Sequence, residues 1–288
     1  MVTKTISPGT RVNPLDDPLA ANQAIDEVLS GSKNELPVIG LIPPDVYQLP
    51  GGLARDGVLI RQVKVRELTG EHEEALARAS QATTNIFHFI NTLLECGTVQ
   101  IGDEPEANTK KLLKDLVVGD RDAVILFIRQ ATYGDDIIVP DWECPDCGNK
   151  TNLTIPISDI TTKEINSPSE YTFTVSLKNK RKALVRLANG HDQTALYDNA
   201  KLTQAERDTI LLSRCVATLT DADGTEHSLA GMPSIARRMA IPDRRAILKA
   251  MADRQPGPRY FDISFKHEDC GKEAMINLGI GDLFLDLF

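Results

Sequence analysis

Residues 142–148, which read WECPDCG, carry two cysteines three positions apart, with a glycine directly after the second cysteine. Two thiolates at this spacing form half of a typical four-ligand zinc site. The one similar spacing elsewhere in the chain is HEDCG at 267–271, which also places a glycine after its second ligand. Together the two motifs supply three sulfurs and one imidazole. The sequence therefore predicts a closed structural zinc site, with one Zn²⁺ per chain, held by Cys144, Cys147, His267 and Cys270.

Two other interpretations of the cysteine pair stay open. The first is a redox-active C-x-x-C, but such a pair normally opens a helix in a thioredoxin-like βαβ unit, and here apolar, strand-like segments flank it. The second is two unrelated turns, or a surface pair that binds no metal. The glycine after each motif favours a metal-binding turn, because glycine accepts the left-handed backbone that lets N–H groups point at a thiolate.

The composition is that of an ordinary soluble globular protein. The chain has 288 residues, of which 41% are hydrophobic and 25% charged, and its formal net charge is −9. This acidic balance argues against general binding to nucleic acid or to anionic membranes. No apolar run approaches the length of a membrane span, and the N-terminal residues lack the apolar core of a secretory signal. Five sparse cysteines argue against a disulfide framework.

An internal repeat links the two cysteine motifs. A shift of 123 residues places Asp120-Arg121 on Asp243-Arg244, Asp146-Cys147-Gly148 on Asp269-Cys270-Gly271, and Cys144 on His267. The window contains eight identities in 38 positions, where about two are expected from average composition. Further upstream a shift of 120 aligns VRELTG at 65–70 with VRLANG at 185–190. We infer two copies of one unit, each supplying half of the metal site.

The pattern of elements predicts an α+β fold of two pseudo-equivalent halves, each with a strand, helices and a β-knuckle. The halves are expected to be joined by a shared zinc-ribbon-like module and preceded by an extended N-terminal arm. The expected boundaries are 1–57 for the Pro/Gly-rich arm, 58–161 for the half that ends in the CxxC knuckle, and 162–288 for the half with the HxxC knuckle and an apolar tail. Within the first half, a strand at 58–68 and one long helix at 70–96 are expected.

The two chain ends carry apolar residues without an obvious helix or hairpin of their own. The segment LPVIGLIPPDVYQLPGG at 36–52 has four prolines, which exclude a helix and a central strand. The chain closes with LFLDLF at 283–288. We expect at least one end to dock on a neighbouring subunit, since exposed apolar patches commonly mark interaction surfaces. The alternative is that both ends fold back onto the core of the chain.

No constellation of side chains indicates catalysis. No nucleophile–base pair can be assembled from the sequence, and a Cys3His zinc site has no open coordination position with which to activate water. The basic run at 178–182, KNKRK, is interpreted as a solvated hairpin tip, with a phosphate contact as the alternative. The sequence thus predicts a non-enzymatic protein.

Two stretches resemble a known family. The first stretch is VKVRELTGEHEEALARA, which starts at residue 63. The second is LVVGDRD at 116–122, which is followed by a YGD strand and the CPDCG knuckle. They resemble the baseplate hub and baseplate assembly proteins of T-even-like contractile-tail bacteriophages. The match covers roughly residues 58–160, and the second half fits as a weaker continuation. The departure from the family pattern is His267, which stands where a cysteine is expected.

The resemblance implies a structural or assembly component of a phage tail baseplate, in the hub region, without catalysis. It implies a virion location after assembly in the host cytoplasm. The implied partners are other tail proteins (hub, wedge or the end of the tape measure), with several copies around the tail axis and with neither membrane nor nucleic acid. The alternative function is a zinc-ribbon adaptor that binds nucleic acid or a polymerase. The acidic residues of the knuckles favour the baseplate interpretation.

Overall fold

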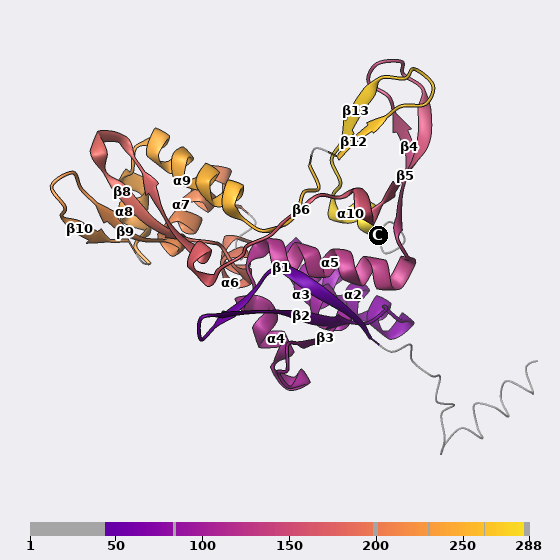
Figure 1. Cartoon of the computed structure of the whole chain (residues 1–288), viewed down its shortest axis with the longest axis horizontal. Coiled ribbons are helices and arrows are strands. Elements are labelled where there is room, and N and C mark those ends of the chain that lie inside the picture. The colour runs from indigo at the N-terminus through magenta and orange to yellow at the C-terminus, as the bar shows by residue number, and fades with distance from the viewer. Residues whose placement is uncertain (1–43, 83–84, 198–200, 230, 262, 285–288) are drawn as a thin grey trace, which may run out of the picture. The chain divides into compact units, whose positions relative to one another are not determined.

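An antiparallel three-stranded sheet opens the part of the chain that the computed structural model describes, which is residues 44–82, 85–197, 201–229, 231–261 and 263–284. Its strands lie in the order β1-β2-β3 (Figure 1) and are β1 (Asp45–Arg55), β2 (Val58–Val65) and β3 (Thr98–Ile101). Four helices belong to the same half: α2 (Gly70–Ala82), α3 (Ile86–Gly97), α4 (Glu106–Asp115) and α5 (Val118–Tyr133).

The boundary expected for the N-terminal arm needs a correction. Residues 45–55, which were placed in the arm, form the edge strand β1 and pair with β2. Pro50 is compatible with this strand because β1 lies at the edge of the sheet, where a missing N–H does not break a ladder on both sides. A break in the β1–β2 register between Gln48 and Leu53 accommodates Pro50 and the two glycines. The rest of the arm, residues 1–43, lies outside the described residues.

The helix expected over residues 70–96 is two helices. Asn85 is the N-cap of α3, and its side chain accepts a hydrogen bond from the Phe87 N–H at 2.9 Å. Asparagine at this position satisfies one of the free donors at a helix start, so a new helix begins there. The hydrophobic periodicity continues across the break, and this is why the sequence pattern alone suggested a single helix.

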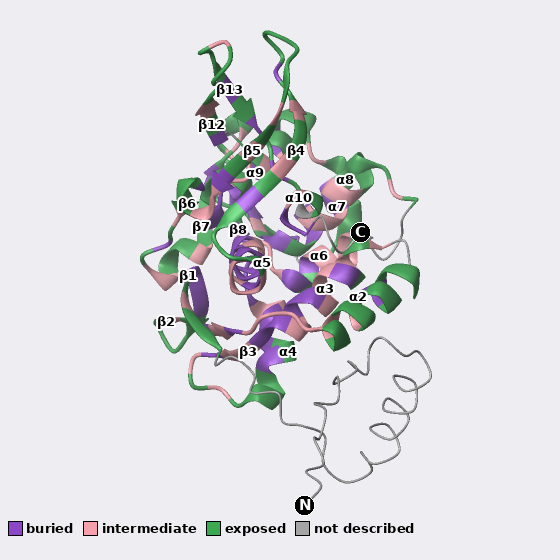
Figure 2. Cartoon of the chain, turned by 90° about the vertical axis from the view of Figure 1, so that its right-hand side faces the viewer, coloured by how far each residue is buried: buried purple, intermediate pink, exposed green. Residues whose placement is uncertain are grey.

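Helix α5 is the central element of the first half, as the buried colouring of its inner faces shows (Figure 2). Ala123, Val124, Ile125, Leu126 and Ile128 are all buried. The ring of Phe127 stacks on Tyr47 of β1, with centroids 4.5 Å apart. The main core of the chain combines this helix with apolar residues from the sheet, from α3 and α4, and from the C-terminal end. An apolar helix packed on one face of a sheet gives the half its hydrophobic interior.

The second half has a four-stranded sheet and four helices of its own. Its antiparallel sheet has the order β10-β9-β8-β7, from β7 (Thr172–Ser176), β8 (Lys182–Arg186), β9 (Val216–Thr220) and β10 (Glu226–Ser228). Its helices are α6 (Gly190–Tyr197), α7 (Gln204–Cys215), α8 (Pro233–Arg238) and α9 (Ile241–Arg254). A separate core forms around Val185, Leu212, Val216 and Ile247. Two short strands, β6 (Thr162–Lys163) and β11 (Gly257–Pro258), pair with each other.

A buried aspartate at the start of a helix ties each sheet to its helix. Asp120, fully buried in α5, accepts hydrogen bonds from the N–H groups of Gly51 and Gly52 in β1 at 2.7 and 2.8 Å. Asp243, buried in α9, accepts from the Lys178 N–H at 3.0 Å and from the Arg181 guanidinium at 2.6 Å. The two aspartates are aligned positions of the sequence repeat. The long-range bond from Asp120 to β1 is a contact that the sequence did not indicate.

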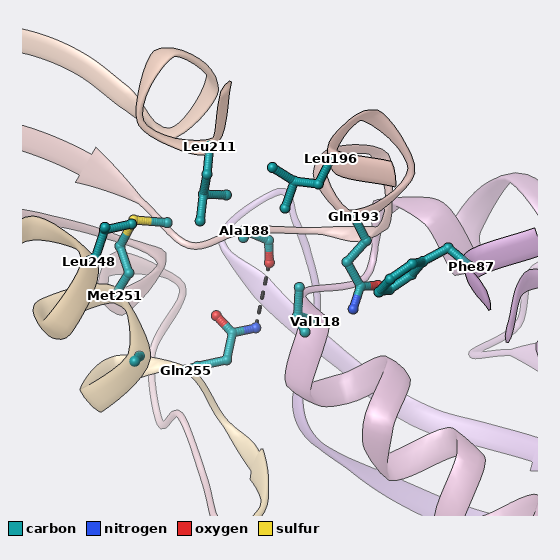
Figure 3. A pocket seen from close by; sticks show the side chains of 10 residues that line it. Phe87, Val118, Ala188, Gln193, Leu196, Leu211, Leu248, Met251 and Gln255 are labelled. Atoms are coloured by element: carbon teal, nitrogen blue, oxygen red, sulfur yellow. Dashed lines mark hydrogen bonds between the residues drawn. The ribbon is translucent and has the colours of Figure 1, made fainter. Parts of the chain in front are cut away.

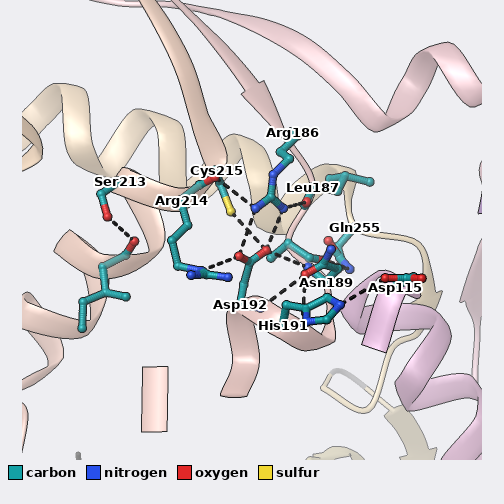
Figure 4. A network of polar contacts seen from close by, with 12 residues as sticks. Asp115, Arg186, Leu187, Asn189, His191, Asp192, Ser213, Arg214, Cys215 and Gln255 are labelled. Carbon is teal, nitrogen blue, oxygen red and sulfur yellow. Dashed lines mark hydrogen bonds and ion pairs between the residues drawn. The ribbon is translucent and has the colours of Figure 1, made fainter. Parts of the chain in front are cut away.

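A third buried carboxylate, Asp192, binds side chains and backbone around the start of α6 (Figure 4). Arg186 and Arg214 donate to its two oxygens at 2.7 Å each, and the Asn189 N–H donates at 3.0 Å. Burial disfavours the charged form, but these donors outweigh it and hold the pKa of Asp192 below its ordinary value. The network joins β8, α6 and α7 into one unit.

The described parts of both chain ends fold back onto the core. Leu49 is fully buried, and Leu283 and Phe284 are 3% and 1% exposed. The short helix α10 (Ile280–Leu283) brings Phe284 edge-on to Tyr133, with ring centroids 6.2 Å apart. The alternative of folding back therefore holds for these residues. Residues 285–288, like residues 1–43, lie outside the described part of the chain.

The buried aspartates give a first prediction. Replacing Asp120 with alanine leaves two buried backbone N–H groups without acceptors, so the free energy of unfolding should fall by about 2–4 kcal/mol. Asp243→Ala should produce a loss of similar size, and the exposed Asp103→Ala serves as a control with little effect. Denaturant titrations of the three variants would measure this. A stability of Asp120→Ala equal to that of the control would contradict the assigned role.

Candidate metal centre

Two antiparallel hairpins carry the predicted ligands at their tips (Figure 1). The first hairpin is β4 (Asp136–Glu143) with β5 (Lys150–Pro156), and the second is β12 (Ile263–Lys266) with β13 (Glu273–Ile276). Along the strands, Ile137, Ile155, Ile263 and Ile276 are buried in the main core, whereas their neighbours face outward. This alternation fixes the register of each hairpin, and so fixes which residues reach the tip.

The two tips have the same backbone geometry. In the first, the Cys144 N–H donates to the Asn149 carbonyl at 2.9 Å and the Gly148 N–H donates to the Cys144 carbonyl at 2.8 Å. In the second, the His267 N–H donates to the Lys272 carbonyl and the Gly271 N–H to the His267 carbonyl, at the same two distances. Gly148 and Gly271 both have positive φ, 72° and 68°, which explains the glycine after each ligand pair.

The structure brings all four predicted ligands together. The ligand atoms of Cys144, Cys147, His267 and Cys270 all lie within 4.8 Å of one another. The sulfurs of Cys144 and Cys270 are 3.9 Å apart. The Nδ1 atom of His267 lies 3.6 Å from the Cys147 sulfur and 3.3 Å from the Cys270 sulfur. Each hairpin contributes two ligands, so the cluster exists only where the two tips meet.

These separations match a tetrahedral metal site. Metal–sulfur bonds of about 2.3 Å and metal–nitrogen bonds of about 2.0 Å imply sulfur–sulfur edges of about 3.8 Å and sulfur–nitrogen edges of about 3.5 Å. The observed edges lie close to these values, and a sulfur–sulfur distance of 3.9 Å is far too long for a disulfide. Three thiolates and one imidazole are soft ligands that suit zinc. The donor set therefore fits a single metal ion.

Aromatic rings support the cluster from inside. His267 is 2% exposed and Cys144 is 1% exposed, so half of the ligand set is shielded from solvent. Trp142 packs edge-on against Phe265 at 4.9 Å and lies 5.7 Å from the His267 ring. These rings connect the tip of one hairpin to the other and hold the imidazole in place. The sequence analysis did not assign this role to Trp142 or Phe265.

Polar side chains brace the two tips from outside. Lys272 Nζ lies 2.7 Å from the Asp146 carboxylate, and its pKa is raised by that hydrogen bond. Asn149 Nδ2 donates to Asp269 at 3.2 Å. The aspartate from each tip thus binds a residue of the other tip. The repeat could have indicated this exchange, because Asp146 aligns with Asp269 and Asn149 with Lys272.

A separate cavity of 290 Å³ opens among α5, α6, α7 and α9 (Figure 3). Its wall is mostly apolar and includes Phe87, Val118, Leu196, Leu211, Leu248 and Met251. Gln193 adds an amide, whose oxygen accepts from Arg121 Nε at 2.7 Å. No thiol, imidazole or carboxylate lines this cavity, so its described walls suit the burial of an apolar group better than acid–base chemistry.

The described chain contains both helices and strands, with a Cys/His cluster between two hairpins. Comparison of the sequence with models of known families identifies its family. The family model described as T4 bacteriophage base plate protein matches residues 48–285, which is most of the chain, so the chain belongs to this family. The match confirms the resemblance found in the sequence and extends it through the second half. Searches of curated proteins and of solved structures found no match. No described helix is long and apolar enough to cross a membrane.

The meeting of the two tips can be tested by crosslinking. In a Cys147→Ser variant stripped of metal, mild oxidation should join Cys144 to Cys270, because their sulfurs are 3.9 Å apart. Peptide mapping by mass spectrometry would identify the bond. Cys96 and Cys215, which lie outside the cluster, act as internal controls and should remain unlinked. If the products were purely intermolecular, the two hairpins would not meet as described.

Proposed function

We propose that this chain is a structural or assembly component of the hub region of a phage contractile-tail baseplate, stabilised by a structural zinc ion. The observation that carries this proposal is the family match over residues 48–285, which encloses both halves and both hairpin tips. Its partners are other tail proteins at the hub, the wedge or the end of the tape measure, with several copies around the tail axis. Assembly takes place in the host cytoplasm, and the finished location is the virion tail.

The zinc ion, in this proposal, joins the two halves and has no catalytic role. Cys144, Cys147, His267 and Cys270 would fill all four positions of a tetrahedral ion, which leaves none for water or substrate. A metal held in this way contributes its binding free energy to folding. The baseplate family is a structural one, and this agrees with a non-enzymatic role.

Elemental analysis of the purified protein should find about one zinc per chain. Both Cys147→Ser and His267→Ala should lose most of the metal, and chelation should lower the melting temperature of the wild-type protein by about 10 °C or more, because the binding free energy is lost. Cys96→Ala is the matched control, since Cys96 lies outside the cluster, and it should keep the metal. A wild-type metal content near zero would refute the zinc proposal.

The chain is also proposed to contain two copies of one unit, with halves near 58–161 and 162–288 and with β1 added to the first. In each sheet the second strand shifts register against the third, between Lys64 and Val65 in β2 and between Leu184 and Val185 in β8. These two irregularities lie 120 residues apart, which is the offset of the upstream sequence repeat. A matching β-bulge is a detailed feature that two unrelated sheets have no reason to share.

Hydrogen bonds further along the chain repeat at the second offset, 123 residues. Arg121 donates through Nη1 to the Leu113 carbonyl at 2.7 Å, and Arg244 donates through Nη1 to the Ala236 carbonyl at 2.8 Å. Both bonds join a helix to the shorter helix before it, and the turns at Cys144 and His267 agree as described. An experimental structure in which Asp120 and Asp243 fail to superpose when α5 and α9 are aligned would contradict the duplication.

The alternative, a zinc-ribbon adaptor for nucleic acid or a polymerase, is less well supported. Such a module needs basic side chains beside its knuckles to neutralise phosphates. Here Glu143, Asp146, Glu268 and Asp269 are all exposed at the two tips, and the cations nearby are Lys150, Lys266 and Lys272. Lys272 is already paired with Asp146. The surface around the metal centre thus favours a protein partner over nucleic acid.

The baseplate role is tested by the composition of purified particles. Mass spectrometry of phage particles and of tail-assembly intermediates should detect the chain together with hub, wedge or tape-measure proteins. Phage carrying Cys147→Ser should yield fewer complete tails, because the zinc-deprived protein is less stable, whereas phage carrying Cys96→Ala should assemble normally. Absence of the chain from both particles and intermediates would exclude the proposed function.

A further inference from the structure

The second half carries an exposed basic corner around the start of α9. The β7–β8 turn lies against this helix start, because the Lys178 N–H and the Arg181 guanidinium both bind Asp243. Helix α8 is held to α9 by the bond from Arg244 to the Ala236 carbonyl. We call this surface the basic corner; it comprises Lys178, Lys180, Arg238, Ile241 and Arg245.

The cations of the basic corner face solvent without counter-ions. Its two lysines and two arginines are exposed, and among the described residues none has a carboxylate within ion-pair distance. The nearest carboxylate, Asp243, is 2% exposed and already bound by Arg181. Ile241, which lies between Arg238 and Arg245 along the chain, is 65% exposed. An exposed apolar side chain flanked by free cations is suited to a partner with an apolar pocket and an acidic rim.

The backbone of the β7–β8 turn supports a functional role for its cations. Asn179 and Lys180 have φ values of 58° and 60°, the left-handed pair of a tight hairpin turn. Asparagine tolerates this conformation, but at the second position glycine is the favoured residue, and a lysine there carries an energetic cost. Such local strain is common where a side chain serves a binding function. Lys180 places its charge at the tip of the turn despite this cost.

A complementary surface lies around the start of β4, where α10 packs against this strand of the first half. A cavity of 390 Å³ is lined by Tyr133, Asp136, Ile138, Pro140, Asp282 and Leu283, together with Arg129. Asp135 and Asp136 are exposed at its edge, and Ile138 is 55% exposed. We call this surface the acidic pocket. It combines exposed carboxylates with apolar walls. The carboxylates complement the cations of the basic corner, and the apolar walls complement its exposed isoleucine.

The net charge also differs between the two halves of the chain. Residues 43–161 contain 19 acidic and 11 basic residues, whereas residues 162–288 contain 17 acidic and 18 basic residues. Two copies of the chain therefore attract each other when the second half of one approaches the first half of the other, and they repel when their first halves meet. This asymmetry favours a head-to-tail contact over a symmetric one.

We propose that the chain associates with a second copy of itself, head to tail, by inserting Ile241 and the cations of the basic corner into the acidic pocket of the next copy. The contact uses two different surfaces, so a pair of chains still has one free basic corner and one free acidic pocket. Further chains can therefore bind until a ring closes or a filament forms. This inference deepens the proposed presence of several copies per baseplate. Its test uses the isolated protein, so it can fail while the baseplate assignment stands.

The experiment is sedimentation velocity on the zinc-loaded full chain at several protein concentrations. The wild type should associate in about 25 mM NaCl, and the association should weaken about tenfold or more in about 300 mM NaCl, where exposed charges are screened. A corner variant, Lys178→Glu/Lys180→Glu/Arg245→Glu, should be monomeric alone. A pocket variant, Asp135→Lys/Asp136→Lys, should also be monomeric alone. Ile241→Ser should weaken association about tenfold.

Mixing the two variants is the decisive measurement. The corner variant keeps a normal acidic pocket and the pocket variant keeps a normal basic corner, so their mixture should associate although neither does alone. The variant Arg78→Glu/Lys111→Glu changes two exposed charges outside both surfaces and should associate like the wild type. Unchanged melting curves and zinc contents would confirm that each variant folds. A monomeric wild type in low salt, or a mixture that stays monomeric, would overturn the proposal.

Discussion

The meeting of two hairpin tips is the constraint on which the arrangement of the two halves depends. Each hairpin has two strands, and an isolated two-stranded hairpin is marginally stable in water. Each tip also brings two metal ligands, whereas a closed tetrahedral site needs four. Neither half can complete this site alone. The aspartate of each tip also binds a side chain of the other tip. The Cys/His cluster is thus formed jointly by two sequence segments more than a hundred residues apart.

The features that the sequence predicted best are those that depend on the spacing of residues close together along the chain. The C-x2-C and H-x2-C motifs identified the four clustered residues, and the glycines after them have the expected positive φ. The sequence pattern placed the strand expected at 58–68, which is β2 (Val58–Val65), to within three residues. These elements are set by neighbours along the chain, so periodicity and turn chemistry suffice to locate them.

The features that the sequence did not predict depend on contacts across the fold. Strand β1 contains a proline and two glycines, and it becomes a strand because β2 pairs with it and Asp120 binds its glycine N–H groups. The break between α2 and α3 depends on the cap at Asn85, which interrupts an otherwise continuous apolar pattern. Trp142 and Phe265 belong to different hairpins, so their contact follows from the shared centre rather than from either local sequence.

The placement of all four ligands on one chain has a kinetic consequence. When two half-sites belong to separate molecules, their encounter is bimolecular and depends on protein concentration. When one polypeptide carries both, the second half-site is present at an effective concentration in the millimolar range, whatever the abundance of the protein. Capture of a metal by Cys144, Cys147, His267 and Cys270 is then first order in the chain. Such a chain can therefore complete its own fold before it meets any neighbour.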